Sequence, residues 1–496
     1  MSEPLIVVFV HGWSVRNTET YGQLPQRLKA EAARDGLALD VHNLWLSKYI
    51  SFHNEVRLED IARAFEAALT REFGALLAAG RRLAVITHST GGPVVREWLH
   101  RYYLRRGRKS TPLSHLIMLA PANFGSALAQ LGKTRIARLK TWFEGVEPGL
   151  GVLDWLELGS PESWNLNLEW LDFADKAIGM RGVLPFVITG QTIDRKIYDH
   201  VNAYTGEQGS DGVVRVAAAN LNYRYVQLTQ QAPKRNTAAD YLPLRAGKVR
   251  ETGGVPWVLA AGRSHSGDDI GIMRSVRNNR QAHPTVNAIL QCLRVTQLSE
   301  YRKLAETFAR TSAEVMAAER VETVDLPGPF ERTVIHDPCS MVIFRVRDSE
   351  GRPVCDFDLM LTAGKDNSPD RLPPGFFIDR QKNNRDHSVL TYYFNHARMQ
   401  GSAVVQHGDK QMRAALPACE GLGLRIVPYP LSGFVHYVPA VLHVSQAHLQ
   451  NLLQPHSTTL VDVVLHRVVR EGVFRLSQRM DKEDFTKALP GAPIGG

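Results

Sequence analysis

The chain has 496 residues, of which 44% are hydrophobic and 22% are charged. This composition is typical of globular proteins and excludes a disordered chain, a collagen or a coiled coil, and the length favours two to four domains. The net charge is +9, and most of the basic excess falls in the first 300 residues. A basic surface can attract nucleic acid or anionic lipid, but the sequence carries no nucleic-acid motif, so we expect no nucleic-acid partner.

Cysteine spacing and hydropathy bear on the compartment of the protein. The four cysteines lie too far apart for a CxxC zinc or redox pair and are compatible with a reducing compartment. No apolar run approaches the roughly 18 residues that a membrane-spanning helix needs. The apolar stretch from Leu5 to Val10 is short and lacks a basic leader, so we expect no cleavable signal peptide. The expected location is the cytoplasm at synthesis, and any export would follow a non-classical route.

Short apolar runs alternate with amphipathic segments over residues 1–298. Helices are predicted at 21–35, 57–79, 92–106 and 284–293. Strands are predicted at Leu5–Val10, Leu39–Leu46, Leu83–Thr87, His115–Leu119, Leu184–Thr189, Tyr223–Leu228 and Pro256–Ala261. Strands separated by helices predict an α/β domain with a mostly parallel sheet that is covered on both faces.

Residues 126–182 interrupt this alternation, because no strand pattern appears there. Four of the eight tryptophans of the chain fall in or beside leucine-rich helical patterns within this insertion: Trp142, Trp155, Trp164 and Trp170. So many large apolar groups must be buried either against the sheet or against a ligand. We predict a helical cap, and the four tryptophans are its candidate substrate-binding residues.

The pattern changes after residue 298. A helical linker is predicted over 299–325, and residues 326–490 carry short alternating segments that predict an antiparallel β-sandwich of about seven strands. This accessory domain could bind lipid or a protein partner through Val427–Leu431 and Phe434–Ala440, although an ordinary sandwich core explains those residues equally well.

The segment Thr87–His88–Ser89–Thr90–Gly91–Gly92 lies between a predicted buried strand and a predicted helix. A serine on a tight strand-to-helix turn projects its hydroxyl above the sheet, and the helix N-terminus behind it favours developing negative charge. The two glycines suit such a turn because they fit where the backbone is strained. The pattern predicts a nucleophile elbow at Ser89, and a serine that only caps the helix is the alternative.

On several motifs the chain resembles the α/β-hydrolase superfamily and, within it, the lipases. The motifs follow the family order: Val10–His11–Gly12–Trp13, His88–Ser89–Thr90–Gly91–Gly92, Leu119–Ser126, Gly209–Ser210–Asp211–Gly212–Val213–Val214 and Ser264–His265–Ser266–Gly267. The resemblance covers roughly residues 1–300, and Thr87 departs from it because the usual elbow has glycine there. The chain is also similar to lipase effectors of bacterial type VI secretion, which lack a signal peptide and act on membrane phospholipids.

The resemblance implies a catalytic triad of Ser89 as nucleophile, His265 as base and Asp211 as the acid that orients His265. It also implies an oxyanion hole made of the backbone N–H groups of Trp13 and Thr90. His283 is the alternative base and Asp194 the alternative acid, while His88 is expected to be a packing residue. The sequence gives no support for a metal ion or a cofactor.

These residues predict a serine hydrolase that cleaves carboxylic esters of lipids through an acyl-enzyme intermediate. The apolar cap favours an acyl chain, and the basic excess suits an anionic bilayer, so the expected substrate is a phospholipid or another lipid at a membrane surface. Two alternatives stay open: a soluble carboxylesterase or thioesterase with the same triad, and an inactive hydrolase fold that serves as a binding module.

Overall fold

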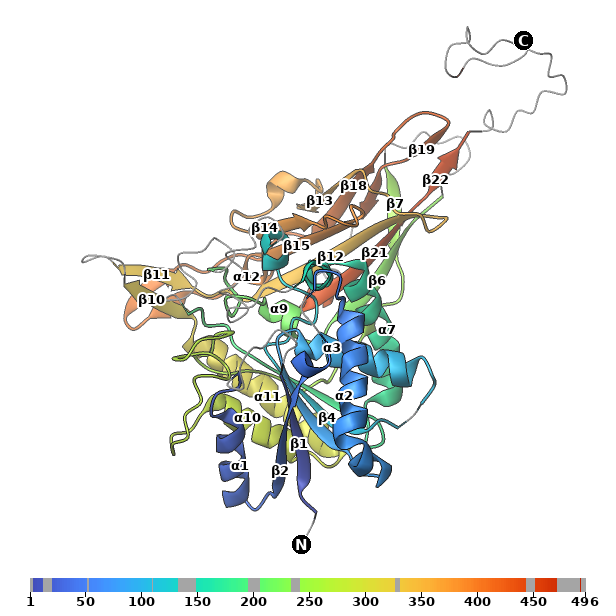
Figure 1. Cartoon of the computed structure of the whole chain (residues 1–496). Coiled ribbons are helices and arrows are strands. Elements are labelled where there is room, and N and C mark those ends of the chain that lie inside the picture. The colour runs from blue at the N-terminus through green and yellow to red at the C-terminus, as the bar shows by residue number, and fades with distance from the viewer. Residues whose placement is uncertain are drawn as a thin grey trace, which may run out of the picture.

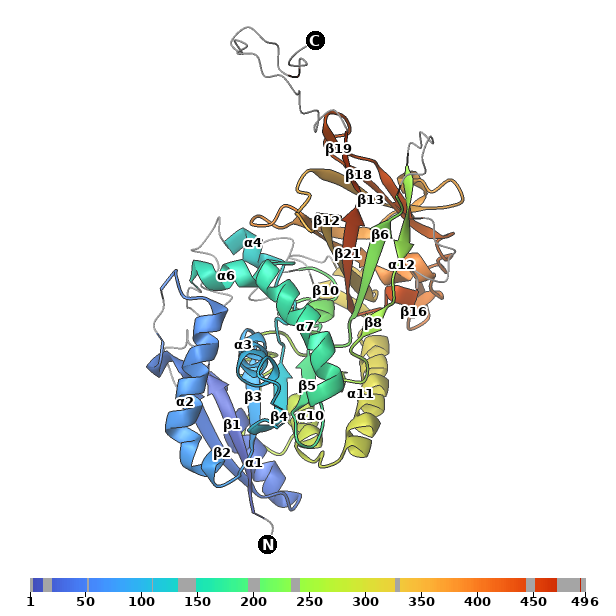
Figure 2. The same ribbon diagram turned by 90° about the vertical axis from the view of Figure 1, so that its right-hand side faces the viewer.

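The structure of the chain is a computed structural model. It describes residues 3–11, 20–50, 53–108, 110–132, 149–194, 206–232, 241–325, 331–442, 451–470 and 491. Two bodies are evident, a parallel sheet flanked by helices and a β-rich part stacked on one end of it (Figure 1, Figure 2).

The first body contains a six-stranded sheet in the order β2-β1-β3-β4-β5-β9, and every pairing in it is parallel. Its strands are β1 (Leu5–His11), β2 (Leu39–Trp45), β3 (Leu83–His88), β4 (Leu113–Leu119), β5 (Leu184–Thr189) and β9 (Trp257–Leu259). The central strands read as continuous apolar runs because side chains on both of their faces are buried.

Helices cover both faces of this sheet. One face packs against α1 (Leu24–Arg34), α10 (Pro284–Leu293) and α11 (Leu298–Ala318). The other packs against α2 (Leu58–Ala78), α3 (Gly91–Leu99), α6 (Leu150–Leu156) and α7 (Pro161–Ala177). Helix α11 occupies the expected linker but lies on the sheet, where the Tyr301 hydroxyl donates to the Pro185 carbonyl oxygen at 2.7 Å.

The second body is organised around a ten-stranded mixed sheet in the order β13-β18-β20-β7-β6-β21-β12-β15-β14, with β8 paired to β6. Its strands are β6 (Arg224–Gln230), β7 (Leu242–Ala246), β8 (Arg250–Glu251), β12 (Cys339–Asp348), β13 (Phe357–Ala363), β14 (Phe377–Lys382), β15 (Val389–Asn395), β18 (Leu422–Pro428), β20 (Ala440–Leu442) and β21 (Thr458–Leu465). The predicted fold class is confirmed, but β21 pairs in parallel with both β12 and β6.

The remaining elements are short. They are η1 (Leu46–Lys48), the π-helix η2 (His100–Leu104), α4 (Leu128–Gly132), α9 (Val216–Ala219), β10 (Val321–Asp325), β11 (Glu331–Ile335), η3 (Pro369–Arg371), α12 (His396–Gln400), β16 (Val405–His407), β17 (Lys410–Arg413), β19 (Val435–Tyr437) and β22 (Arg467–Val469). Within the described ranges, no helix combines the length and the apolar character needed to cross a bilayer.

One predicted strand lies in a different sheet from the one expected. Tyr223–Leu228 forms most of β6, which joins the second sheet instead of the parallel one. The reason lies in its burial, which alternates from Val226 to Gln230 as in a strand with one covered face, whereas the central parallel strands are buried throughout. The domain boundary at residue 298 stays a prediction. Strands β6, β7 and β8 belong to the second sheet although they precede residue 298 in the chain.

Candidate active site

Ser89 occupies a strained turn between β3 and α3. Its φ is 52°, in the left-handed region that side chains rarely adopt, and its amide donates to the Leu119 carbonyl oxygen at 3.0 Å. A Cβ added at Gly92 would lie 2.9 Å from the Pro121 Cβ, and one added at Gly91 would lie 3.1 Å from the Thr87 Cβ. The two glycines therefore avoid close contacts that a side chain would make in this turn. Gly91 leaves space for Thr87, which stands where the usual elbow has glycine.

His265 contacts Ser89 although 176 positions separate them. The His265 Nε2 lies 3.1 Å from the Ser89 Oγ, and the Nδ1 on the other side of the ring lies 2.9 Å from the Asp211 Oδ2. A backbone bond fixes the same pair, because the His265 amide donates to the Asp211 carbonyl oxygen at 2.9 Å. A serine, an imidazole and a carboxylate are thus connected in the order that nucleophile activation requires.

The Asp211 carboxylate is fully buried and bonded through both of its oxygens. Its Oδ1 accepts from the backbone N–H groups of Val213 at 3.0 Å and Val214 at 2.8 Å, and its Oδ2 faces His265. Three contacts therefore fix the carboxylate with its Oδ2 toward the imidazole.

The structure also places the two alternative residues. Asp194 is buried after β5, but the carboxylate hydrogen-bonded to the His265 Nδ1 is that of Asp211. The His283 Nε2 lies 3.1 Å from the Ser275 Oγ and 3.4 Å from an Arg263 nitrogen. Burial and the Arg263 charge lower the pKa of His283 to about 4.

His88 contributes more than packing. Its Nε2 lies 3.1 Å from the His265 carbonyl oxygen, and the two rings are 4.7 Å apart. Burial, followed by the nearby His265 charge, lowers the pKa of His88 well below its usual range. A neutral His88 therefore donates its Nε2–H to the His265 backbone, and its place directly before the serine was the available sequence signal.

The two predicted oxyanion donors are described unequally. Thr90 follows the serine and is the N-cap of α3, so its amide lies at the positive end of a helix dipole. Trp13 lies outside the described residues. The structure therefore describes one of the two proposed oxyanion donors, and the assignment of the oxyanion hole stays a prediction.

The predicted substrate-binding tryptophans lie in the interior where the structure describes them. Trp155, Trp164 and Trp170 are 3%, 1% and 0% exposed and belong to the largest apolar cluster. The Arg96 guanidinium stacks 4.5 Å from the Trp170 ring centre. Trp142 lies outside the described residues, and the role of all four in substrate binding stays a prediction.

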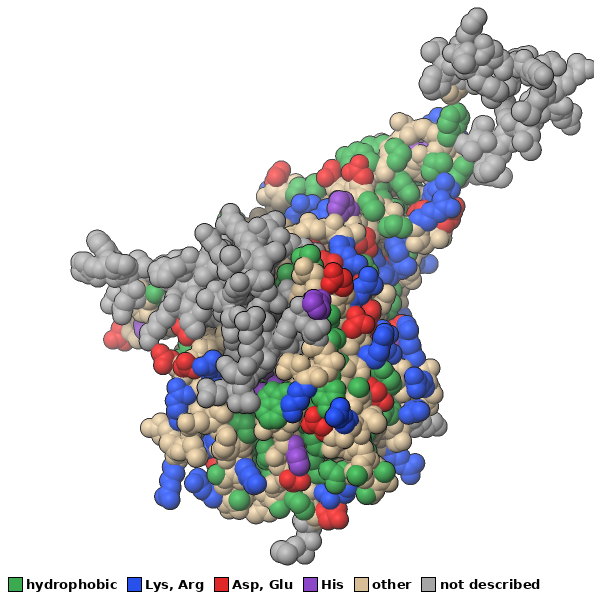
Figure 3. All heavy atoms as spheres, viewed as in Figure 1, with side chains coloured by type: hydrophobic (Ala, Val, Ile, Leu, Met, Phe, Trp, Pro, Cys, Tyr) green, Lys and Arg blue, Asp and Glu red, His purple; other side chains and the backbone are tan. Residues whose placement is uncertain are grey.

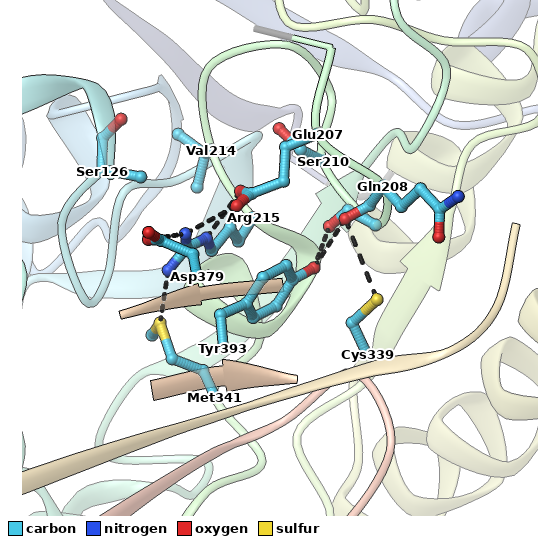
Figure 4. A network of polar contacts seen from close by, with 12 residues as sticks. Ser126, Glu207, Gln208, Ser210, Val214, Arg215, Cys339, Met341, Asp379 and Tyr393 are labelled. Carbon is cyan, nitrogen blue, oxygen red and sulfur yellow. Dashed lines mark hydrogen bonds and ion pairs between the residues drawn. The ribbon is translucent and has the colours of Figure 1, made fainter. Parts of the chain in front are cut away.

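The sequence did not predict the role of the polar side chains around the Asp211 loop. Arg215 is 1% exposed and bonds Glu207 on its own loop and Asp379 on β14 (Figure 4). The signal was an arginine amid apolar residues, two positions after Val213. Over the described parts of the chain, no three His, Cys, Asp or Glu side chains gather in a way that would hold a metal ion.

A helix-covered parallel sheet with a strained serine turn and a Ser–His–Asp contact chain defines an α/β-hydrolase of the serine ester hydrolase class. The chain is similar to phospholipase PlaB from Legionella pneumophila, with 42% identity and a TM-score of 0.85 over 97% of this chain and 98% of that chain. It therefore belongs to the family of this phospholipase.

Other comparisons add less. The structure of the same Legionella protein in complex with thio-NAD matches at 42% identity and a TM-score of 0.84, over 97% of each chain. The mature lipase BlEst2 from Bacillus licheniformis is 16% identical, with a TM-score of 0.29 over 44% of this chain and 79% of that chain, which is too low to carry a structural argument. No protein-family profile and no curated protein sequence matches the chain.

Proposed function

We propose that this chain is a phospholipase that hydrolyses carboxylic esters of membrane lipids through an acyl-enzyme intermediate. The observation that carries the proposal is the contact chain from the Ser89 Oγ through His265 to Asp211, in a protein 42% identical to a phospholipase over nearly its whole length.

In the first half-reaction, the Ser89 Oγ attacks the ester carbonyl carbon while its proton passes to the His265 Nε2 over a 3.1 Å contact. Asp211 stabilises the imidazolium through the Nδ1–H bond. The amides of Thr90 and Trp13 bind the tetrahedral oxyanion, and the loss of one such donor typically costs about 10²–10³-fold in kcat. The intermediate collapses as His265 returns the proton to the leaving alcohol, and water then releases the fatty acid by the same steps.

The proposed place of action is the surface of a membrane. On the face drawn in Figure 3, Lys and Arg side chains are interspersed with Asp and Glu, which indicates a mixed surface and not one uniform basic patch. An anionic bilayer would thus be one favourable surface but not a requirement. Export by type VI secretion and a protein partner of the C-terminal part stay predictions.

The test is hydrolysis of phospholipid vesicles, neutral and anionic, by the full-length protein, with analysis of head group and acyl position in the products. We expect release of fatty acid and its loss in Ser89→Ala. A soluble carboxylesterase or thioesterase would instead cleave short-chain esters and leave the vesicles intact. Labelling with a fluorophosphonate addresses the third alternative, because an inactive binding module would stay unlabelled while an active Ser89 loses its label in Ser89→Ala.

A further inference from the structure

The loop that carries Asp211 is a tight turn closed by Arg215. The Val216 amide donates to the Gly209 carbonyl oxygen at 2.8 Å, and Ser210 and Arg215 form a β-bridge across the turn. The Asp211 amide donates to the Val214 carbonyl oxygen at 3.2 Å inside this turn. The orientation of the Asp211 side chain therefore depends on where the two ends of the turn are held.

One end is held by the Arg215 guanidinium, which is buried between the two bodies of the molecule. Its Nε and Nη2 each lie 2.7 Å from a Glu207 carboxylate oxygen, and its Nη2 also bonds Asp379 on β14 (Figure 4). Burial opposes the charge of Arg215, but the two carboxylates outweigh burial and raise its pKa. The Asp379 side chain is 9% exposed, so little water reaches its carboxylate and the guanidinium supplies the positive charge next to it.

The other end of the turn is held by Tyr393 on β15. Its hydroxyl donates to the backbone carbonyl oxygen of Gln208 at 2.8 Å, and the Gly209 carbonyl oxygen lies 3.2 Å from the same hydroxyl. A Cβ added at Gly209, whose φ is 68°, would lie 2.5 Å from that hydroxyl, so the loop backbone and the tyrosine are in direct contact. The ring of Tyr393 also lies 4.1 Å from the Arg215 guanidinium carbon, which joins the two attachments into one network.

From these contacts we propose that Asp379 and Tyr393, both supplied by the β-rich C-terminal part, are positioning residues for the catalytic acid Asp211. The inference rests on the proposed triad and goes beyond it. The accessory sheet thus attaches both ends of the acid loop, in addition to the contacts that Asp211 itself makes with Val213, Val214 and His265. Asp379 contacts the Arg215 side chain and Tyr393 contacts the loop backbone at Gln208, so each would act on Asp211 through the loop of residues 208–215.

The experiment compares two variants of the full-length protein with two matched controls on the same vesicles. Asp379→Asn removes the charge next to Arg215, and Tyr393→Phe removes only the hydroxyl that faces the loop. Asp462→Asn is the control for the first, because Asp462 is a buried partner of Arg345 and Arg347 in the same sheet. Tyr392→Phe is the control for the second, because the Tyr392 hydroxyl bonds the Leu359 carbonyl oxygen within the C-terminal part.

The measurements are kcat, KM, the rate of fluorophosphonate labelling and the melting temperature. We expect both test variants to lose kcat and labelling rate, by up to about 100-fold for a displacement of the order of 1 Å, with KM unchanged. Both controls should keep kcat even where their melting temperatures fall. Because Tyr393→Phe preserves the ring, it tests the inference if Asp379→Asn does not fold.

Two results would overturn the inference. In the first, the test variants keep the wild-type kcat. In the second, the controls lose as much kcat as the test variants, which would make the effect one of general stability. A separate variant, Asp211→Asn, tests the proposed triad itself. If it keeps full activity, the proposed acid and with it the positioning role fail, whereas its inactivity beside an unaffected Tyr393→Phe refutes only the positioning role. Loss of vesicle hydrolysis in the wild type, or its persistence in Ser89→Ala, would refute the proposed function itself.

Discussion

Replacement of Asp211 by asparagine tests the triad most sharply, because the surrounding N–H groups dictate which way the amide must face. The carboxylate Oδ1 accepts from the amides of Val213 and Val214, both of which can only donate. The asparagine must therefore place its oxygen at that position and its NH₂ group toward His265. The side chain keeps its volume, so we expect the fold to persist.

The consequence for His265 follows from hydrogen-bond chemistry. An NH₂ group 2.9 Å from the Nδ1 makes that nitrogen an acceptor, which places the ring proton on the Nε2 that faces the Ser89 Oγ. A protonated Nε2 cannot take the serine proton. In serine proteases with the same three groups this change lowers kcat about 10⁴-fold, which corresponds to about 5.4 kcal/mol at 1.36 kcal/mol per tenfold.

The assay is ester hydrolysis with vesicles and with a soluble ester, combined with the melting temperature of the variant. The matched control is Asp194→Asn, which alters the other buried aspartate that the sequence left open as the acid. We expect Asp194→Asn to keep its kcat. The reasoning is refuted if Asp211→Asn keeps a kcat within about tenfold of the wild type, or if Asp194→Asn proves the more damaging change.

Three further predictions follow from other parts of the chain. Gly92→Ala should lower the free energy of unfolding by about 1–3 kcal/mol, because its methyl group would meet Pro121 and the Met118 sulfur; denaturant unfolding that matches the wild type would contradict this. Trp170→Ala should lower that free energy by about 3–5 kcal/mol. A change in chain-length selectivity without loss of stability would instead assign Trp170 to substrate binding. Burial lowers the pKa of His115 and of His456 to about 4 each, so both are neutral in the folded chain and titrate near their ordinary pKa once it unfolds. The contribution of these two histidines to the free energy of unfolding is complete above about pH 6.5. It is lost as the pH falls toward 4, by up to about 1.4 kcal/mol per pH unit for each histidine. Denaturant unfolding at pH 7.5 and 5.5 checks the sign, and His115→Gln should reduce the dependence of the unfolding free energy on pH.

The elements that the sequence predicted well are those whose signals are local. The elbow at Ser89 depends on about ten consecutive residues, in which a buried strand, a strained serine and two glycines follow one another. Much of the parallel sheet is also local in origin, because its central strands β1, β3 and β5 are apolar runs. The choice between Asp211 and Asp194 was not local, since Asp194 follows one predicted strand and Asp211 lies in a turn before another, and only the folded chain shows which one meets His265.

The assignment of β6 failed for a related reason. An alternating strand pattern tells which of its faces is covered, but it does not name the sheet that the strand joins. Its partner β21 lies more than 200 residues further along the chain, and their parallel pairing aligns Val226 with Val461. The tryptophans of the insertion show the same limit, because an apolar side chain can be buried by ligand or by protein, and the structure places Trp170 inside the protein.

Arg215 shows what a residue pattern can reveal before its partners are known. An arginine between Val214 and Val216, in a stretch that is otherwise apolar, must be charged and therefore needs a buried acid. One such acid, Glu207, is eight residues away and belongs to the same loop, but the other, Asp379, is 164 residues away on a strand of the second body. The bond between Arg215 and Asp379 connects the accessory sheet to the loop that carries Asp211. The acid loop therefore contacts both bodies of the molecule, and the two predicted domains meet at the loop that carries Asp211.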